Sequence, residues 1–179
     1  MNKKYPKKNH VTEPNIISKY YFNFMKNKII EVGNFHEKKN VLDYGCGTGD
    51  LKKLNLQKKN KSTIINYDII EELSEIKDWR EINFDTIVFC QVLVLIEPIQ
   101  IRNILDFIKR KNSNVEIITV ISSQSIINKI GGIILGHFDS HGDTKTEPTV
   151  EKQIFNEKCS LIHKSSYFNL FEILKFKLK

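Results

Sequence analysis

The sequence predicts an α/β fold: a doubly wound, mostly parallel sheet with helices on both faces and an antiparallel hairpin at the C-terminal end. Short β-branched segments alternate with segments of helical spacing along the chain. A glycine-rich turn follows the first of these strands. The length of 179 residues, 40% of them hydrophobic, fits one domain with its own core.

The helices are predicted from apolar residues that recur at helical spacing. Residues 16–32 form such a segment, and Gly33 stands where the helix would end. A short helix begins near Asp50, and a third runs from Pro98 to the basic residues 109–111. We also expect a helix-like segment over 71–77 and an apolar helical face over 126–135.

The strands are predicted over residues 40–44, 62–68, 85–90 and 115–122, which are rich in β-branched and apolar residues. Residues 160–167 and 170–179 are predicted to pair as the C-terminal hairpin around a turn at Asn169. Only sixteen residues lie between Asp68 and Asp85. A helix, a strand and a loop do not fit there, so the third strand of such a sheet is expected to be short or missing.

Composition and charge set the expected surroundings of the protein. Residues 1–11 are interpreted as a flexible basic tail and residues 12–179 as the single domain. The net charge of +7 makes a nucleic-acid partner possible, but the cations are nearly all lysines, so this partner is not favoured. The three cysteines are scattered, and no secretory signal or membrane-spanning stretch is visible, so a cytoplasmic location is expected.

The most informative segment is the turn after the first strand, Val41-Leu42-Asp43-Tyr44-Gly45-Cys46-Gly47-Thr48-Gly49-Asp50. Glycines between a strand and a helix let backbone N–H groups approach a ligand. A dinucleotide fingerprint would need its third glycine at position 50, which is Asp, so a nicotinamide cofactor is disfavoured. The observed G-x-G-x-G pattern, with an acidic residue two positions ahead, resembles motif I of the Rossmann-like class I S-adenosylmethionine-dependent methyltransferases.

The resemblance implies how the cofactor is bound. The turn would pack against its amino acid and ribose parts, with Asp43 near the methionyl ammonium, Asp68 on the ribose hydroxyls and Ile69 against the adenine. Asp78 is the candidate for the adenine amino group, and Trp79 could cover the adenine with its ring. The full set of implied cofactor-binding residues is Asp43, Tyr44, Gly45, Cys46, Gly47, Gly49, Asp68, Ile69, Asp78, Trp79, Cys90 and Gln91.

Two further segments are implied to lie near this site. Cys90 and Gln91 correspond to the turn after the family's fourth strand, which borders cofactor and substrate. The segment before motif I often closes over the cofactor in this family, and here it carries Lys19, Tyr20 and Tyr21.

The candidate catalytic group is the polar segment His137-Phe138-Asp139-Ser140-His141-Gly142-Asp143. A hydroxyl acceptor needs a base, so we expect His141 or His137 to act as general base, oriented by Asp139. The alternatives are a polar surface loop and a metal site, although ligands two residues apart in one loop rarely converge. No metal is therefore predicted.

The sequence thus favours methyl transfer from S-adenosylmethionine to an oxygen or nitrogen of a small molecule, with S-adenosylhomocysteine as the product. Methylation of RNA or protein is a first alternative, motivated by the net charge. A domain of the same fold that binds the cofactor or a partner without catalysis is a second, motivated by the short segment between Asp68 and Asp85.

Overall fold

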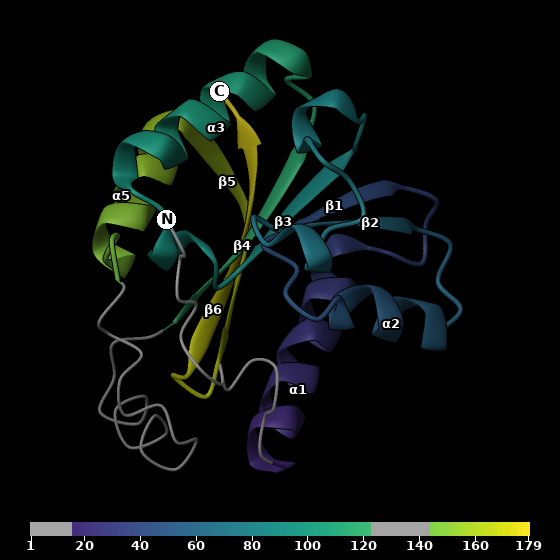
Figure 1. Ribbon diagram of the computed structural model, residues 1–179. Helices are drawn as coiled ribbons and strands as arrows, with labels where there is room; N and C mark the ends of the chain where they lie inside the picture. The colour runs from purple at the N-terminus through teal and green to yellow at the C-terminus, as the bar shows by residue number, and fades with distance from the viewer. Residues whose placement is uncertain (1–15, 123–143) are drawn as a thin grey trace, which may run out of the picture.

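The computed structural model describes residues 16–122 and 144–179. They form a six-stranded sheet in the order β2-β1-β3-β4-β6-β5, with helices packed on both faces (Figure 1). The strands are β1 (Asn40–Tyr44), β2 (Thr63–Tyr67), β3 (Thr86–Cys90), β4 (Glu116–Ser122), β5 (Cys159–Tyr167) and β6 (Phe171–Leu178). The first four pair in parallel, and β6 pairs antiparallel with β4 and β5. The predicted fold class, including the C-terminal hairpin, is confirmed.

Two helical layers enclose the sheet, because successive strand side chains point to opposite faces. On one face lie α1 (Ile16–Gly33) and α2 (Asp50–Gln57), which pack on Val41, Val88 and Ile118. On the other lie α3 (Pro98–Lys111) and α5 (Pro148–Lys158), which pack on the alternating neighbours of those residues, such as Leu42, Ile87 and Ile117.

The edge of the sheet at β2 shows what replaces a third strand. Between β2 and β3 the chain forms only two short 3-10 turns, η1 (Glu71–Leu73) and η2 (Trp79–Glu81). The Glu75 amide donates to the Asn66 carbonyl at 3.0 Å, and the Glu75 carboxylate accepts from the Asn66 amide at 3.3 Å. The expected helix-like segment over 71–77 is wrong, because Ser74 and Glu75 run alongside β2 and Ser74 is extended.

The helix α5 was not anticipated from the sequence. It begins with Pro148 in its first turn and buries Glu151, Ile154 and Phe155 against the sheet. The predicted face over 126–135 lies outside the described residues. No helix in the described ranges is long and apolar enough to span a bilayer.

Candidate functional site

The glycine turn joins β1 to α2 in a backbone conformation that side chains rarely adopt. Gly45, Gly47 and Gly49 have φ angles of 75°, 54° and 69°. A Cβ atom on Gly45 would lie 2.3 Å from Val92, and one on Gly49 would lie 2.7 Å from the Asn66 amide nitrogen. Positions 45 and 49 therefore accept only glycine without a local rearrangement.

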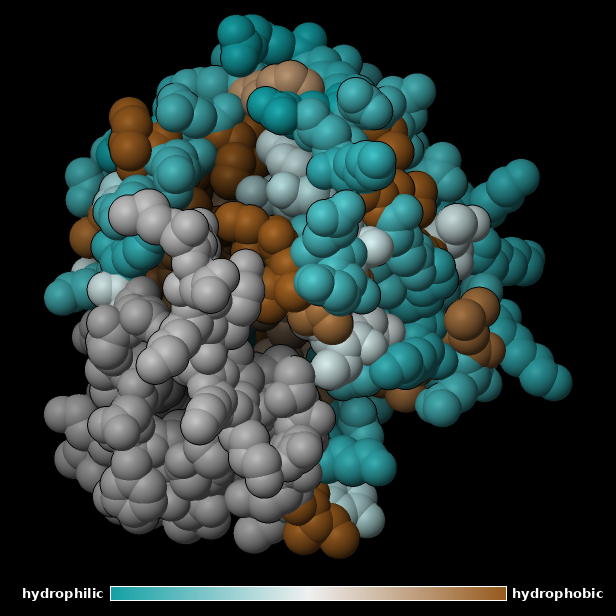
Figure 2. Space-filling view, viewed as in Figure 1, coloured by the Kyte–Doolittle hydropathy of each residue, from teal (hydrophilic) through white to brown (hydrophobic). Residues whose placement is uncertain are grey.

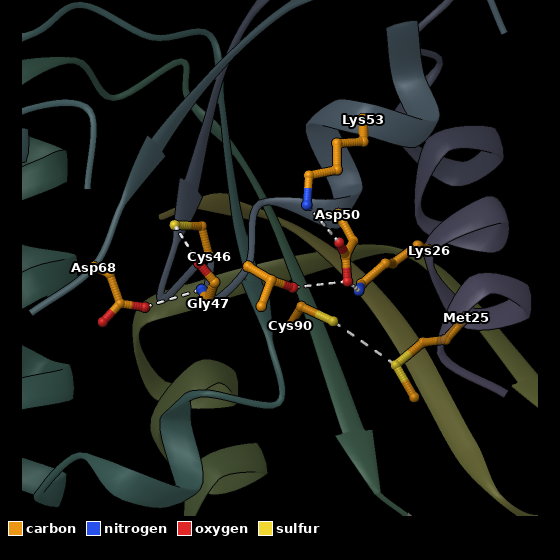
Figure 3. A network of polar contacts seen from close by, with 9 residues as sticks. Met25, Lys26, Cys46, Gly47, Asp50, Lys53, Asp68 and Cys90 are labelled. Carbon is orange, nitrogen blue, oxygen red and sulfur yellow. Dashed lines mark hydrogen bonds and ion pairs between the residues drawn. The ribbon is translucent and has the colours of Figure 1, made fainter. Parts of the chain in front are cut away.

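The end of β2 holds this turn in place. The carbonyl of Tyr67 accepts the amides of Gly45 at 2.8 Å and Cys46 at 3.1 Å. The carboxylate of Asp68 accepts the amide of Gly47 at 2.9 Å, as Figure 3 shows. The ends of β1 and β2 thus form one hydrogen-bonded unit.

Asp68 retains capacity for a ligand. Its second oxygen accepts the amide of Ile70 at 3.0 Å, so each carboxylate oxygen has one backbone donor and at least one further lone pair. The side chain is only partly buried, and the neighbouring Ile69 is 90% exposed. Asp68 and Ile69 therefore present a paired acceptor and an apolar side chain at the carboxyl end of β2.

Asp43 is the most unusual group of the site. It is 2% exposed, and its Oδ1 has no hydrogen-bond partner among the described residues. Its pKa is raised to about 7, mainly by burial, which outweighs the lowering by Lys26 and is reinforced by nearby Asp68 and Asp50. A buried carboxyl oxygen without a donor calls for a cation or an N–H group to complete it. An ammonium group fits that requirement.

Lys26 of α1 connects the helix to the turn. Its ammonium donates to Asp50 at 3.0 Å, and Asp50 also accepts from Thr48 at 2.8 Å and Lys53 at 3.1 Å (Figure 3). Burial raises the pKa of Asp50, but these donors outweigh it and lower the value to about 2. Sequence analysis did not find Lys26, because a lysine on a helix gives no local signal of a partner twenty-four residues away.

The two cysteines of the site are not acidic thiols. Cys90 donates its S–H toward the sulfur of Met25 at 3.7 Å, and Cys46 donates toward the carbonyl of Leu73 at 3.4 Å. Burial is the main cause that raises the pKa of both thiols to about 12. Both therefore stay protonated at neutral pH and pack beside the turn.

Asp78 and Trp79 are placed differently from the expectation. Trp79 is 6% exposed, and its ring lies in the core on the α3 face, 5.5 Å from the Tyr44 ring and 5.2 Å from the Phe107 ring. It does not cover the site, because its apolar ring is already buried. Asp78 pairs with Arg80 at 2.7 Å. The Tyr44 ring also points to the α3 face, away from Asp43.

On α1, the three residues that the resemblance placed near the cofactor separate. Lys19 and Tyr20 are exposed, Tyr20 by 73%, whereas Tyr21 is partly buried against Phe171 of β6. Only Tyr21 turns toward the sheet. The candidate catalytic residues His137, Asp139 and His141 lie outside the described residues.

The face in Figure 2 is hydrophilic over most of its described surface, with apolar side chains gathered near the middle. Several basic residues of the described ranges pair with acidic ones, for example Lys52 with Glu75 at 2.7 Å and Lys158 with Asp106 at 2.7 Å.

Comparisons with known proteins give a structural likeness without a sequence match. No family model matches the chain, and no curated protein matches it. A protein of Pyrococcus horikoshii OT3 has a TM-score of 0.63 at 12% identity, over 89% of this chain and 91% of the other. Magnesium protoporphyrin IX methyltransferase from Synechocystis PCC 6803, crystallised with bound SAH, has a TM-score of 0.60 at 14% identity, over 92% and 88%.

A third similar structure is N,N-8-amino-8-demethyl-D-riboflavin dimethyltransferase from Streptomyces davawensis. Its TM-score is 0.65 at 12% identity, over 89% of this chain and 55% of the dimethyltransferase. This chain has the fold of the class I S-adenosylmethionine-dependent methyltransferases.

Proposed function

We propose that this chain is an S-adenosylmethionine-dependent methyltransferase that acts on an oxygen or nitrogen of a small molecule. The observation that carries the proposal is the buried, unpartnered Oδ1 of Asp43 beside a turn that admits only glycine at positions 45 and 49. A carboxylate acceptor for an ammonium and a close backbone approach are what this cofactor's amino acid part requires.

Each end of the proposed cofactor site has a chemical task. Asp43 would receive the ammonium, the glycine turn would pack on the amino acid and ribose parts, and Asp68 would accept from the ribose hydroxyls. Ile69 would lie on the adenine, which suits its exposure. When bound, S-adenosylmethionine supplies a methyl group on a sulfonium that needs no further activation. Positioning of the acceptor is then the main demand on the protein.

The base that an acceptor hydroxyl would need is proposed to be His141 or His137, oriented by Asp139. The described part of the site supports this indirectly. The Cys46 and Cys90 thiols have pKa values raised to about 12, so neither accepts a proton at neutral pH. Asp50 accepts hydrogen bonds from two lysines and a threonine, which lower its pKa to about 2, so it does not take up a proton at neutral pH either.

A small-molecule acceptor is supported by the similar structures. The named neighbours are methyltransferases of magnesium protoporphyrin IX and of an aminoriboflavin, and another was solved in complex with apigenin.

Calorimetric titration with S-adenosylhomocysteine tests the proposal. The wild-type protein is expected to bind with micromolar affinity, about 8 kcal/mol, and Asp68→Ala to lose it, because the ribose hydroxyls lose their acceptor and the turn loses its anchor. Asp106→Ala is the matched control, since Asp106 lies on α3 and pairs only at the surface. NAD is expected not to bind. A folded wild-type protein that binds no S-adenosylhomocysteine would contradict the proposal.

A further inference from the structure

Three polar side chains from three different elements meet at the carboxyl ends of β3 and β4. The amide nitrogen of Gln91, just after β3, donates to the hydroxyl of Ser122, the last residue of β4, at 2.9 Å. The side chain of Tyr21 on α1 lies near the same Gln91, which lowers the pKa of the Tyr21 phenol. We call Tyr21, Gln91 and Ser122 the β3–β4 polar cluster.

The backbone of Gln91 is strained. Its φ is +58°, in the left-handed region that glycine adopts freely and other residues rarely do. The other described non-glycine residues with positive φ are in turns between elements, namely Asn34, Lys59, Phe168 and Asn169. Gln91 likewise follows the end of an element, here the central strand β3, and lies in the connection that leads to η3 (Leu93–Leu95). Strain at such a place is typical of a residue whose side chain has a task.

The β3–β4 polar cluster lies next to the glycine turn. Residues 44 and 89 are partners in the β1–β3 pair, so Gln91 leaves the sheet beside Cys46. The close approach between Gly45 and Val92 shows that the two turns touch. An acceptor bound to the cluster would therefore be next to a cofactor bound to the turn.

The β3–β4 polar cluster is neutral. Burial raises the pKa of Tyr21 to about 12, so its phenol stays protonated at neutral pH. Gln91 and Ser122 have no charge. Two neighbouring contacts are apolar: Tyr21 packs edge-on against Phe171 at 5.8 Å between ring centroids, and Cys90 lies on Met25.

We propose that Tyr21, Gln91 and Ser122 bind the methyl acceptor, and that the acceptor has an uncharged hydroxyl or amino group on a flat apolar body. The cluster offers donors and acceptors without a counter-charge, so a charged group there would lose hydration without an ion pair. The Tyr21 ring offers the aromatic surface that a flat body contacts. This inference rests on the proposed function, because it specifies the acceptor of the same reaction.

The test is calorimetric binding of three probes that share one flat body and differ in charge: naphthol, naphthoate and naphthylmethylammonium. Each is titrated into protein saturated with S-adenosylhomocysteine, so no turnover is needed. Naphthol is expected to bind about tenfold tighter than either charged probe, since only it keeps its hydrogen bonds without an unpaired charge. Binding of S-adenosylhomocysteine itself is measured first. If it fails, the proposed function fails, independently of the acceptor question.

Two variants and one control separate recognition from structural support. Tyr21→Phe is expected to weaken naphthol binding about fivefold and to leave S-adenosylhomocysteine affinity and the unfolding temperature nearly unchanged. Tyr20→Phe, the same change at the exposed neighbouring residue, should alter neither. Gln91→Glu keeps the shape but adds a negative charge, and should make naphthylmethylammonium the preferred probe.

Four results would overturn the inference. These are charged probes binding the wild-type protein as tightly as naphthol, no binding of any probe by the saturated protein, and probe affinities unchanged in both Tyr21→Phe and Gln91→Glu. The fourth is a parallel fall in unfolding temperature, S-adenosylhomocysteine affinity and naphthol affinity in Tyr21→Phe, which would show that the cluster only attaches α1 to the sheet.

Discussion

Two buried carboxyl groups lie on opposite faces of the sheet, Asp43 on the α1 face and Glu151 on the α5 face. They are equally hidden, with 2% and 1% exposure, and burial raises the pKa of each to about 7. Glu151 accepts a hydrogen bond at 2.7 Å from Thr119 of β4, whereas Oδ1 of Asp43 has no partner among the described residues.

The difference separates a structural acid from a ligand-binding one. Glu151 carries its donor within the fold, so its buried oxygen is accounted for. Asp43 lies beside a strained glycine turn, a second carboxylate at Asp68 and a lysine, where a bound ammonium would complete its hydrogen bonding. A perturbed pKa alone does not distinguish the two residues, but the unpartnered oxygen does.

The largest expected difference between the two acids is in cofactor binding. Asp43→Asn should weaken S-adenosylhomocysteine about a hundredfold, because the ammonium loses a buried negative partner. Glu151→Gln is the matched change on the other face and should leave the affinity unchanged. Calorimetric titration of both variants at pH 8 measures this. Equal affinities in the two variants would mean that Asp43 is also structural.

The two acids are expected to behave alike when protein stability is measured instead of cofactor binding. Both acids have folded-state pKa values raised above those of the unfolded chain, so between about pH 4 and pH 7 the folded state holds a proton that the unfolded state has released. Wild-type stability should therefore fall as pH rises through this window. Asn and Gln cannot ionise, so each variant should exceed the wild type by roughly 3–4 kcal/mol at pH 8 and by almost nothing at pH 4.

Urea unfolding of the wild type and of both variants across that pH range measures this effect. Asp43→Asn should then combine higher stability at pH 8 with lost cofactor binding, whereas Glu151→Gln should show the stability gain alone. A stability gap that does not change with pH would show that folding does not raise the pKa values of the two acids.

The smallest expected effect tests the cation near Asp43. Lys26→Met removes the charge that lowers the pKa of Asp43, so more of the acid is protonated at pH 7. S-adenosylhomocysteine should bind about fivefold more weakly there, and the rise of its affinity with pH should shift to higher pH. Lys53→Met is the control, because Lys53 also binds Asp50 but is largely exposed and does not affect Asp43. The same loss in both variants would assign the effect to Asp50.

Local patterns predicted most of the fold. The strand over 40–44 and the helix over 98–111 match β1 and α3, because β-branched runs and a proline start with a basic end are signals contained within one segment. The missing third strand followed from chain length alone. The helix α5 was not predicted, since its buried face is short and includes Glu151, which a sequence pattern counts as polar.

The site residues also divide into those that local sequence patterns predicted and those that they did not. The glycine turn, Asp43 and Asp68 were predicted because motif residues close to strand ends need no knowledge of distant segments. Trp79 was assigned to the site wrongly, since an aromatic residue in a short connection gives no sign of which side of the chain it packs on. The roles assigned to His137, Asp139 and His141 stay predictions.

The sequence by itself determined the order of the strands, the glycine turn and the acidic ends of β1 and β2, because spacing, propensity and positive φ are properties of neighbouring residues. Only the tertiary structure decided that Lys26 reaches Asp50, that Gln91 meets Ser122, and that Oδ1 of Asp43 is buried without a partner among the described residues. These contacts join residues from separate elements. Their energies depend on burial and on distances that exist only once α1 has packed on the sheet.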